Sequence, residues 1–335
     1  MKRAWTKAKG WVDPYVLLQF GMVALAAVLP ATGAAVRPVG IATDLAVAFL
    51  FFLYGARLSA DQTLQGIKHW RLHSLVLAFT YVMFPILGVV ASFAARPVLG
   101  PDLAAGMLFL CLLPSTVQSS VAFTSIAHGN VAASIVAASV SNLLGVVITP
   151  LLVLLTMGAA AGIDLGTIQS LFLKLVLPFI IGQLMHRWLG GFLTRNKQII
   201  SKFDRGAILL VVYSAFSAGM RGDMFGKLSA VQLVALLAAC CILLAIVIAA
   251  TMIISKAFGF SWHDRTAIIF AGSKKSMASG LPMAQVIFPA ATVGILVLPL
   301  MLFHQIQLMV CAQLARRWSA IPPEKHETAP TTGVR

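Results

Sequence analysis

The chain has few charged residues and almost no glutamate. Only 10% of its 335 residues are Asp, Glu, Lys or Arg, and the only glutamates are Glu324 and Glu327; an ordinary soluble protein has roughly 25% charged residues. Apolar residues make up 59% of the chain, and the mean hydropathy is +0.93. A soluble globule of this length could not bury so much apolar surface. The composition excludes a cytosolic enzyme, a disordered chain and a secreted disulfide scaffold, and it predicts an all-α polytopic membrane protein.

The sequence also lacks the motifs of metal, redox and enzyme chemistry. The four cysteines, Cys111, Cys240, Cys241 and Cys311, lie inside apolar runs and do not have metal-ligand spacing, so we expect neither a disulfide nor a metal site. No His-Glu-x-x-His, G-x-S-x-G or Walker A motif is present. We therefore expect no enzyme, no organic cofactor and no ATP-driven module.

What the sequence does contain is a series of long apolar runs. A helix needs about 20 residues to cross the hydrocarbon core of a bilayer. Ten candidate spans occur, at residues 14–31, 38–56, 73–95, 103–127, 130–157, 165–186, 206–220, 228–255, 263–288 and 290–315. The runs do not show the alternation that a membrane β-barrel requires.

Lysine and arginine are distributed unevenly between the two sides that ten spans create. If the N-terminus is cytoplasmic, the outer segments hold only Arg37, Arg96, Arg221 and Lys227. Three lysines lie within spans, and the other 18 of the 25 basic residues lie on the cytoplasmic side. This bias predicts an inner-membrane protein with both termini in the cytoplasm. It also explains the net charge of +15 by topology, so we expect no nucleic-acid partner.

We expect four segments along the chain: a cytoplasmic N-terminal segment at 1–13, a first five-helix repeat at 14–157, a second at 165–315, and a disordered cytoplasmic tail at 319–335. The basic start and the apolar run after it are similar to a secretory signal. However, Asp13-Pro14 interrupts the pattern, and removal of the run would leave nine spans. We interpret it as a retained first helix.

Two spans contain polar interruptions. Residues 113–120 read Leu-Pro-Ser-Thr-Val-Gln-Ser-Ser, and residues 271–280 read Ala-Gly-Ser-Lys-Lys-Ser-Met-Ala-Ser-Gly. Each lies in the penultimate span of a five-span half, and because five is odd the second half enters the membrane from the opposite side, which predicts an inverted repeat. Backbone groups freed at mid-membrane persist only where they line a cavity or bind something, and half-helix N-termini favour anions. For either interruption alone, a simple proline or glycine kink is the alternative.

Lys274 and Lys275 place two positive charges in the second interruption. A charge at mid-membrane costs about 2.5–3.5 kcal/mol, so each ammonium must face water, protein or ligand. In one interpretation, one or both contact an anionic substrate or occupy a former cation site. In the other, one is buried against freed carbonyls or Asp44 while the other reaches the interface.

The remaining candidate residues are neutral or acidic. Hydroxyl and amide groups at the two interruptions can bind a substrate or the broken backbone itself: Gln118, Ser119, Ser120, Ser273 and Ser276. In the fifth span, Ser134 and Asn142 either line a cavity or allow close helix packing. Asp44 is the only acid well inside a span, and it can pair with a lysine, couple to protons or lie near the outer end.

These motifs resemble those of the bile acid:sodium symporter family, and more narrowly its SBF-like bacterial branch and the related eukaryotic solute carrier family 10. The resemblance covers roughly residues 10–318 and rests on 113–120, Gly129-Asn130, 145–152, Arg265-Thr266, 272–276 and 280–283. It implies a panel domain of helices 1, 2, 6 and 7 and a core domain of helices 3–5 and 8–10. Helices four and nine would cross at their breaks, and one domain would move against the other in alternating access.

The resemblance also implies sodium sites, and here the sequence departs from the family. The helix-four ligands carry over to Ser119 and Ser120, and a helix-three position falls near Thr80. On helix nine, Phe270 stands where the family has glutamate. The two lysines stand where it has glutamine and asparagine. An ammonium in that place repels sodium and can replace it electrostatically, and proton coupling through a lysine is a second route.

We therefore expect a symporter-like secondary transporter whose partners are a small organic anion and the lipid bilayer, with the anion bound near the crossing of helices four and nine. Sodium or a proton is the expected coupling ion. The alternative is a non-transporting membrane regulator or sensor that acts through a partner protein. The sequence does not indicate the oligomeric state.

Overall fold

The computed structural model describes residues 14–57, 69–158, 165–222, 226 and 228–320, and over these ranges the chain is helical without strands. The segments 1–13 and 321–335, for which we expected cytoplasmic positions, lie outside the described residues. The all-helical class predicted from composition is confirmed for the described part of the chain.

The first half of the chain forms one series of helices. They are α2 (Pro14–Val28), the short turn η1 (Gly33–Ala35), α3 (Val36–Arg57), α5 (Trp70–Ala78), the π-helical turn η2 (Phe79–Met83), α6 (Phe84–Leu112), α7 (Val117–Ile126) and α8 (Val131–Met157). Helix α6 changes direction at Gly100, whose φ of 77° lies in the region that favours glycine. Gly88 on the first arm then packs directly against Cys111 on the second.

The second half contains α9 (Leu165–Leu171), the π-helical turn η4 (Phe172–Val176), α10 (Leu177–Arg195), α11 (Lys197–Arg221), α12 (Ala230–Ala257), α13 (Trp262–Gly272), α14 (Met277–Ile287) and α15 (Ala290–Ser319). Helix α11 begins well before the apolar run expected at 206–220, because its first two turns are polar but helical. Helix α15 continues to Ser319, where we expected the tail to begin.

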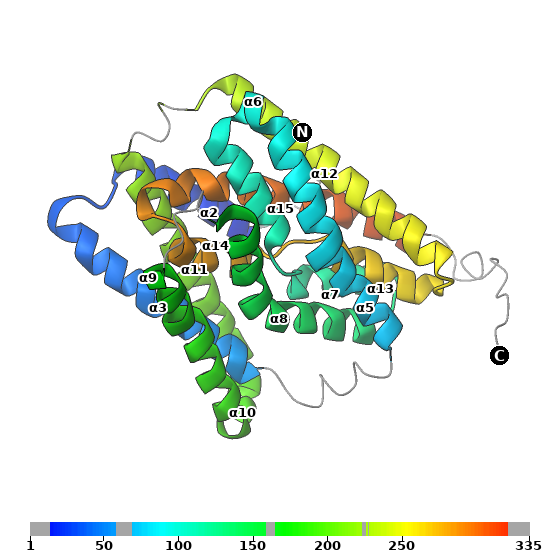
Figure 1. Cartoon of the computed structure of the whole chain (residues 1–335). Helices are drawn as coiled ribbons and strands as arrows, with labels where there is room; N and C mark the ends of the chain where they lie inside the picture. Colours follow the sequence, from blue (N-terminus) through cyan, green and yellow to red (C-terminus); the bar gives the residue numbers. More distant parts are fainter. Residues whose placement is uncertain (1–13, 58–68, 159–164, 223–225, 227, 321–335) are drawn as a thin grey trace, which may run out of the picture.

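The helices pack in two groups that α11 connects. Helices α3 and α10 lie together on one side of the molecule, and α5, α12 and α13 lie on the other (Figure 1). Gly55 and Gly182 let α3 and α10 approach closely, since a side chain at either position would collide with the backbone of the other helix. Helix α11 packs against α2 on one side and against α15 and α14 on the other.

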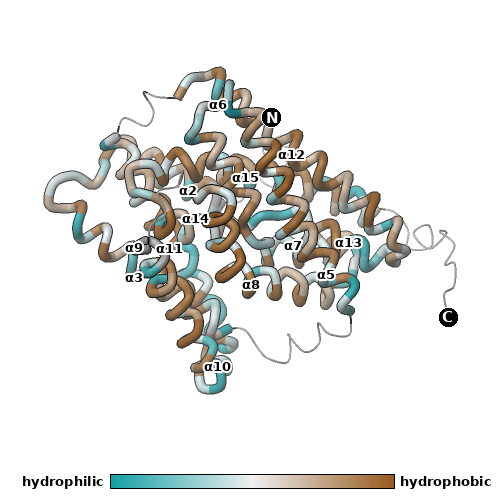
Figure 2. The backbone as a smooth tube through the Cα atoms, viewed as in Figure 1, coloured by the Kyte–Doolittle hydropathy of each residue, from teal (hydrophilic) through white to brown (hydrophobic). Residues whose placement is uncertain are grey.

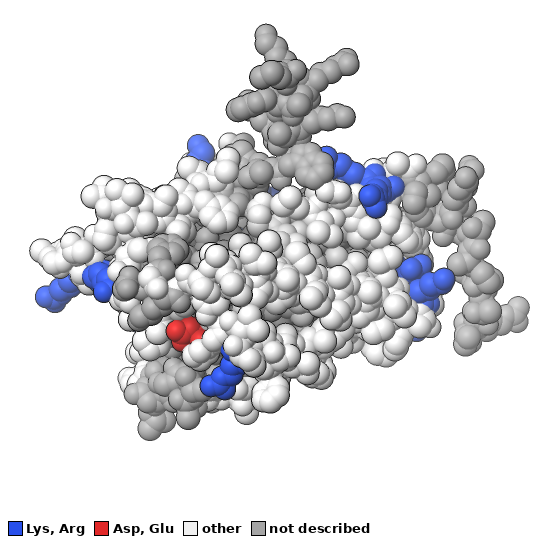
Figure 3. Space-filling model, turned by 90° about the horizontal axis from the view of Figure 1, so that it is seen from above, with Lys and Arg blue, Asp and Glu red and all other residues white. Residues whose placement is uncertain are grey.

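Within the described part of the chain, six helices are long and apolar enough to cross a membrane: 33–57, 70–112, 131–157, 169–195, 230–257 and 290–319. Long hydrophobic stretches cover α12 and α10 (Figure 2), and exposed side chains there include Val234, Ile253, Leu184 and Trp188. On the face seen in Figure 3, the basic residues lie around the edge and uncharged side chains fill the middle. A water-soluble protein does not expose so much contiguous apolar surface, so the fold is that of a polytopic membrane protein.

Candidate functional site

The helical chain breaks at both polar interruptions. Helix α6 ends at Leu112 and α7 begins at Val117, while α13 ends at Gly272 and α14 begins at Met277. The two breaks touch each other: the backbone N–H of Ser276 donates to the Pro114 carbonyl at 2.8 Å. The crossing therefore joins segments about 160 residues apart in the chain.

Hydroxyl groups from the first break and the start of α7 satisfy carbonyls at the second break. Ser120 Oγ donates to the Phe270 carbonyl at 2.8 Å, and Thr116 Oγ1 donates to the Lys275 carbonyl at 2.8 Å. Ser115 Oγ donates to the carbonyl of Ala271 in the same way. Each bond replaces one that an unbroken helix would have made within itself. For Ser120, the structure therefore provides the backbone-binding role rather than a free hydroxyl.

Two long helices brace the breaks from behind. On α8, Ser141 Oγ accepts the Ser115 N–H at 3.0 Å, and Asn142 Nδ2 donates to the Ser115 carbonyl at 2.8 Å. On α15, Gln307 does the same for Lys275: its Oε1 accepts the backbone N–H at 3.0 Å and its Nε2 donates to the carbonyl at 2.9 Å. One residue in each break is thus held at both its N–H and its C=O.

Lys275 is fully buried and bonded to backbone oxygen. Its Nζ lies 2.9 Å from the Thr80 carbonyl and 2.7 Å from the carbonyls of Cys111 and Leu113. The ring of Phe84 lies 4.1 Å from the ammonium. An ammonium has three N–H donors, and each has an acceptor here.

Lys274 is equally buried but has a different environment. Its Nζ has no hydrogen-bond partner among the described residues. It lies 3.8 Å from the ring centroid of Phe123 and 5.6 Å from that of Phe270. Cation–π attraction is therefore the contact that the described residues offer to this ammonium.

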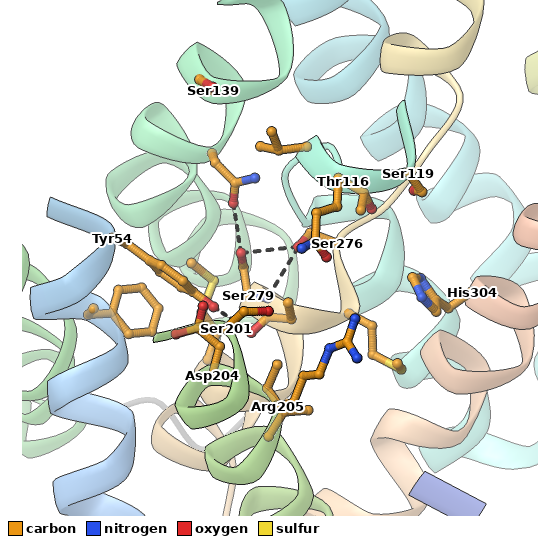
Figure 4. A pocket seen from close by; sticks show the side chains of 18 of the residues that line it. Tyr54, Thr116, Ser119, Ser139, Ser201, Asp204, Arg205, Ser276, Ser279 and His304 are labelled. Atoms are coloured by element: carbon orange, nitrogen blue, oxygen red, sulfur yellow. Dashed lines mark hydrogen bonds between the residues drawn. The ribbon is translucent and has the colours of Figure 1, made fainter. Parts of the chain in front are cut away.

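A cavity of about 420 Å³ lies beside the crossing, between α2, α3, α10 and α11 on one side and α7, α8, α14 and α15 on the other. Side chains from these elements surround it in Figure 4. Its polar lining at the crossing includes Gln118, Ser119, Asn142 and Ser276, and its apolar lining includes Phe51, Val146, Phe179, Ile208 and Met283. The volume lies within the roughly 300–1,000 Å³ typical of ligand pockets.

Charged residues line one end of this cavity. Arg57 donates two hydrogen bonds to Asp204, of 2.6 and 2.9 Å, and thereby joins the end of α3 to α11. The guanidinium of Arg205 lies 5.3 Å from the ring centroid of Tyr15 on α2. Because Arg57 neutralises Asp204, the charge left at this end is positive.

The N-terminus of α7 contributes to the cavity wall without a side-chain cap. Thr116 is the N-cap residue, but its hydroxyl donates to the Lys275 carbonyl instead of accepting from α7. The first N–H groups of a helix have no partner within it. Ser119 on this first turn has a buried Oγ without a hydrogen-bond partner in the described structure. In contrast, Ser276 and Asn130 cap α14 and α8 with their side chains.

The structure separates the predicted site residues into two sets. Gln118, Ser119, Asn142 and Ser276 line the cavity, whereas Ser120, Ser134, Ser273, Lys274 and Lys275 are buried outside its wall. Ser273 Oγ donates to the Ile269 carbonyl, and Ser134 Oγ accepts from Thr124. A substrate contact for either lysine stays a prediction that this geometry does not support directly.

The two candidate coupling residues also lie away from the cavity. Asp44 pairs with Lys174 at 2.8 Å, and both side chains are about half-exposed. Thr80 donates its hydroxyl to the Val76 carbonyl, while its own carbonyl accepts from Lys275. Pairing with a lysine was one of the three roles that the sequence allowed for Asp44, and it is the contact that the structure shows.

Sequence reasoning missed the charged end of the cavity. Arg57 and Arg205 were counted only as topology signals, and Asp204 lies in the polar first part of α11, before the apolar run. Tyr54 carried no signal either, although its hydroxyl donates to the Ala278 carbonyl across the cavity at 3.4 Å. The spacing of Ser201, Asp204 and Arg205, one helical turn on a single face, could have indicated a polar face of α11.

The residues present fit a sodium ion poorly at the helix-nine position. Sodium prefers oxygen ligands, yet an ammonium occupies the oxygen-rich place beside Thr80, and Phe270 supplies no carboxylate. Among the described residues, no group of three His, Cys, Asp or Glu could hold a metal ion. At the helix-four position, the Ser119 hydroxyl oxygen has no partner in the part of the chain that the structure describes, and a sodium site there stays a prediction.

Comparison with known proteins agrees with this architecture. The sequence model of the SBF-like CPA transporter family matches residues 13–320 of this chain. The chain is 48% identical to the uncharacterized protein PA2026 of Pseudomonas aeruginosa and 46% identical to the putative symporter YfeH of Escherichia coli, covering 92% of this chain and 93% of each relative. It is 27% identical to sodium/bile acid cotransporter 7 of Xenopus tropicalis, covering 90% of this chain and 89% of that protein. With almost its whole length matched and six helices of the described residues able to cross a membrane, the chain belongs to the SBF-like CPA transporter family and is a multi-pass membrane transporter.

Proposed function

We propose that this protein is a symporter-like secondary transporter for a small organic anion, which binds in the cavity beside the crossing of the two breaks. The observation that carries the proposal is the N-terminus of α7 in the wall of this cavity, which has no side-chain cap. On its first turn, the Ser119 hydroxyl has no hydrogen-bond partner among the described residues. Free N–H groups and the helix dipole together attract negative charge.

The remaining cavity wall supports an amphipathic anion. Phe51, Phe179 and Met283 offer apolar contact, while Gln118 and Asn142 offer amide groups near the helix end. A ligand with an acidic group and an apolar body matches both. The relative from Xenopus tropicalis is named for bile acid, which is a substrate of this general kind.

We propose ten spans in two inverted five-helix repeats, at 14–157 and 165–315. Helices α2, α3, α10 and α11 would form a panel domain, and the remaining spans a core domain that holds both breaks. Two features support this arrangement. The breaks occur in the fourth and ninth spans, and each is held at N–H and C=O by the helix that follows it. Alternating access would then move one domain against the other across the cavity.

The charged end of the cavity supports a cytoplasmic opening in an inner membrane. Arg57 and Arg205 belong to the segments that the positive-inside rule assigns to the cytoplasm. Both chain termini would lie on the same side. The conformation described here would therefore be the inward-facing one, and the positive charge at its mouth would attract an anion from the cytoplasm.

A direct test combines binding with flux. Carboxylates and sulfonates are screened by thermal shift with sodium and pH varied, and the hits are tested for counterflow in proteoliposomes. We expect Ser119→Asp to lower the affinity for the anion at least about tenfold, because it places a negative charge where the anion binds. Ser119→Ala removes only a hydroxyl and should have a smaller effect.

Ser125→Asp is the matched control, since Ser125 is an exposed residue on the same helix outside the cavity. It should leave anion binding near the wild-type value. Equal binding by Ser119→Asp and wild type would contradict the site. The absence of flux for every anion, together with altered partner signalling in Ser119→Asp, would favour the regulator alternative.

A further inference from the structure

Three backbone carbonyls converge near the crossing because local features remove their helical partners. In η2, the Phe84 N–H donates to the Phe79 carbonyl, and Pro85 has no N–H to donate. The Thr80 carbonyl therefore receives no hydrogen bond from either of these two positions of its own helix. The Ser115 N–H, which would serve Cys111 in a continuous helix, instead donates to Ser141 Oγ. Leu113, the third, lies within the break itself.

All three oxygens point at one place, and the Lys275 ammonium occupies it at 2.7–2.9 Å. Converging backbone carbonyls are the ligands with which proteins bind monovalent inorganic cations. The face of Phe84, 4.1 Å from the nitrogen, adds a negative π surface on another side. The chemistry of this cage is therefore that of a cation site, and its cation is covalently attached to the chain.

Hydrogen bonds hold Lys275 both at its backbone and at its ammonium. Gln307 holds the Lys275 backbone through its N–H and C=O, and the side chain is fully buried. The ammonium links η2, the end of α6 and the α13–α14 break. A cation held in this way has no route of exchange with solvent.

We propose that Lys275 is a tethered cation that replaces a free monovalent cation at this cage, and that removal of its side chain turns the cage into a binding site for sodium, potassium or a small alkylammonium ion. The inference deepens the proposed transport function by excluding this place as an exchange site for a coupling ion. It does not depend on which anion is carried.

The test measures stability instead of flux. Purified Lys275→Ala in detergent is melted in chloride salts of sodium, potassium, methylammonium and choline at one ionic strength. We expect at least one of the three small cations to raise its Tm by about 2 °C or more over choline, because a ligand that binds only the folded state stabilises it. Wild type should not show this gain.

Two neighbouring variants are the controls. Lys275→Met fills the space without a charge and leaves no room for an ion, so its Tm should not depend on the cation. Lys274→Ala removes an equally buried ammonium that has no carbonyl ligand among the residues described, and it should not acquire cation dependence either.

Folded Lys275→Ala with the same cation response as wild type would overturn the proposal. If this variant does not survive purification in choline, it is prepared again in methylammonium and in sodium. Recovery of folded protein in either supports the cage, and failure in both overturns it. Failure of the wild-type protein to move any anion would refute the proposed function and leave this result unaffected, so the two failures are distinguishable.

Discussion

Lys274 and Lys275 are adjacent, chemically identical and equally buried, yet the fold treats them differently. Lys275 has three carbonyl acceptors within 2.9 Å, whereas Lys274 has aromatic rings and no acceptor among the described residues. The two side chains leave a non-helical segment in different directions, so one reaches the end of α6 while the other enters the cluster around Phe123 and Phe270. The hydrogen-bond acceptors around a buried ammonium, and not its burial alone, therefore decide what it contributes to stability.

The largest difference is expected between Lys275→Met and Lys274→Met. The first change leaves three buried carbonyls unpaired, and since each costs about 1–3 kcal/mol we expect a loss of about 3 kcal/mol or more in the free energy of unfolding. The second replaces an ammonium that has no hydrogen bond within the described structure by an apolar chain of similar volume, which is often neutral or stabilising. Thermal and denaturant unfolding in the same detergent measures both, and equal losses would remove the distinction.

An intermediate effect is expected from the residue that positions the Lys275 backbone. Gln307→Leu breaks two hydrogen bonds to the Lys275 backbone, of 3.0 and 2.9 Å, and should cost about 2 kcal/mol. Gln305→Leu, two residues earlier on α15, is the control, because no described residue bonds to its side-chain oxygen. It should change the unfolding free energy by less than about 1 kcal/mol. A larger loss of unfolding free energy in Gln305→Leu than in Gln307→Leu would show that the Gln307 hydrogen bonds to the Lys275 backbone are not the stabilising contact.

The smallest effect is expected for the aromatic contact of Lys274. A double-mutant cycle of Lys274→Met and Phe123→Leu should give a coupling of about 0.5–2 kcal/mol, the range of a cation–π pair. Pairing Phe123→Leu with Lys275→Met instead should give no coupling, because the Lys275 ammonium lies over Phe84. Unfolding measurements on the four proteins of each cycle provide both values. Zero coupling in the first cycle would indicate that Lys274 is neutral or solvated in the folded state.

The two breaks illustrate how much of the site sequence reasoning could predict. Proline, glycine and lysine inside otherwise apolar spans marked the positions of the breaks within a few residues, because lipid tolerates such residues only in special places. Ser119 and Ser120 could not be separated in the same way. They are consecutive, but α7 turns one toward the cavity and the other toward the Phe270 carbonyl.

The charged end of the cavity could not be predicted from the sequence for a related reason. Asp204 looks like an ordinary residue of a cytoplasmic connection until α11 brings it beside Arg57, 147 positions away in the chain. Asp44 had three open roles, and only the packing of α3 against η4 selects its pair with Lys174. Neither pairing leaves a local pattern, since ion pairs between distant helices have no fixed spacing in sequence.

By itself, the sequence determined that this protein is a bundle of helices in a bilayer and that two of its membrane segments are interrupted. Long apolar runs, and polar or helix-breaking residues within them, have the same physical meaning in any fold. Only the tertiary structure decided which polar groups face the cavity, which ones satisfy the broken backbone, and which lysine acts as an internal cation. Those outcomes depend on the directions of individual side chains and on carbonyls brought together from η2, α6 and the α6–α7 break around a lysine of the α13–α14 break. Such convergence exists only once the helices are packed.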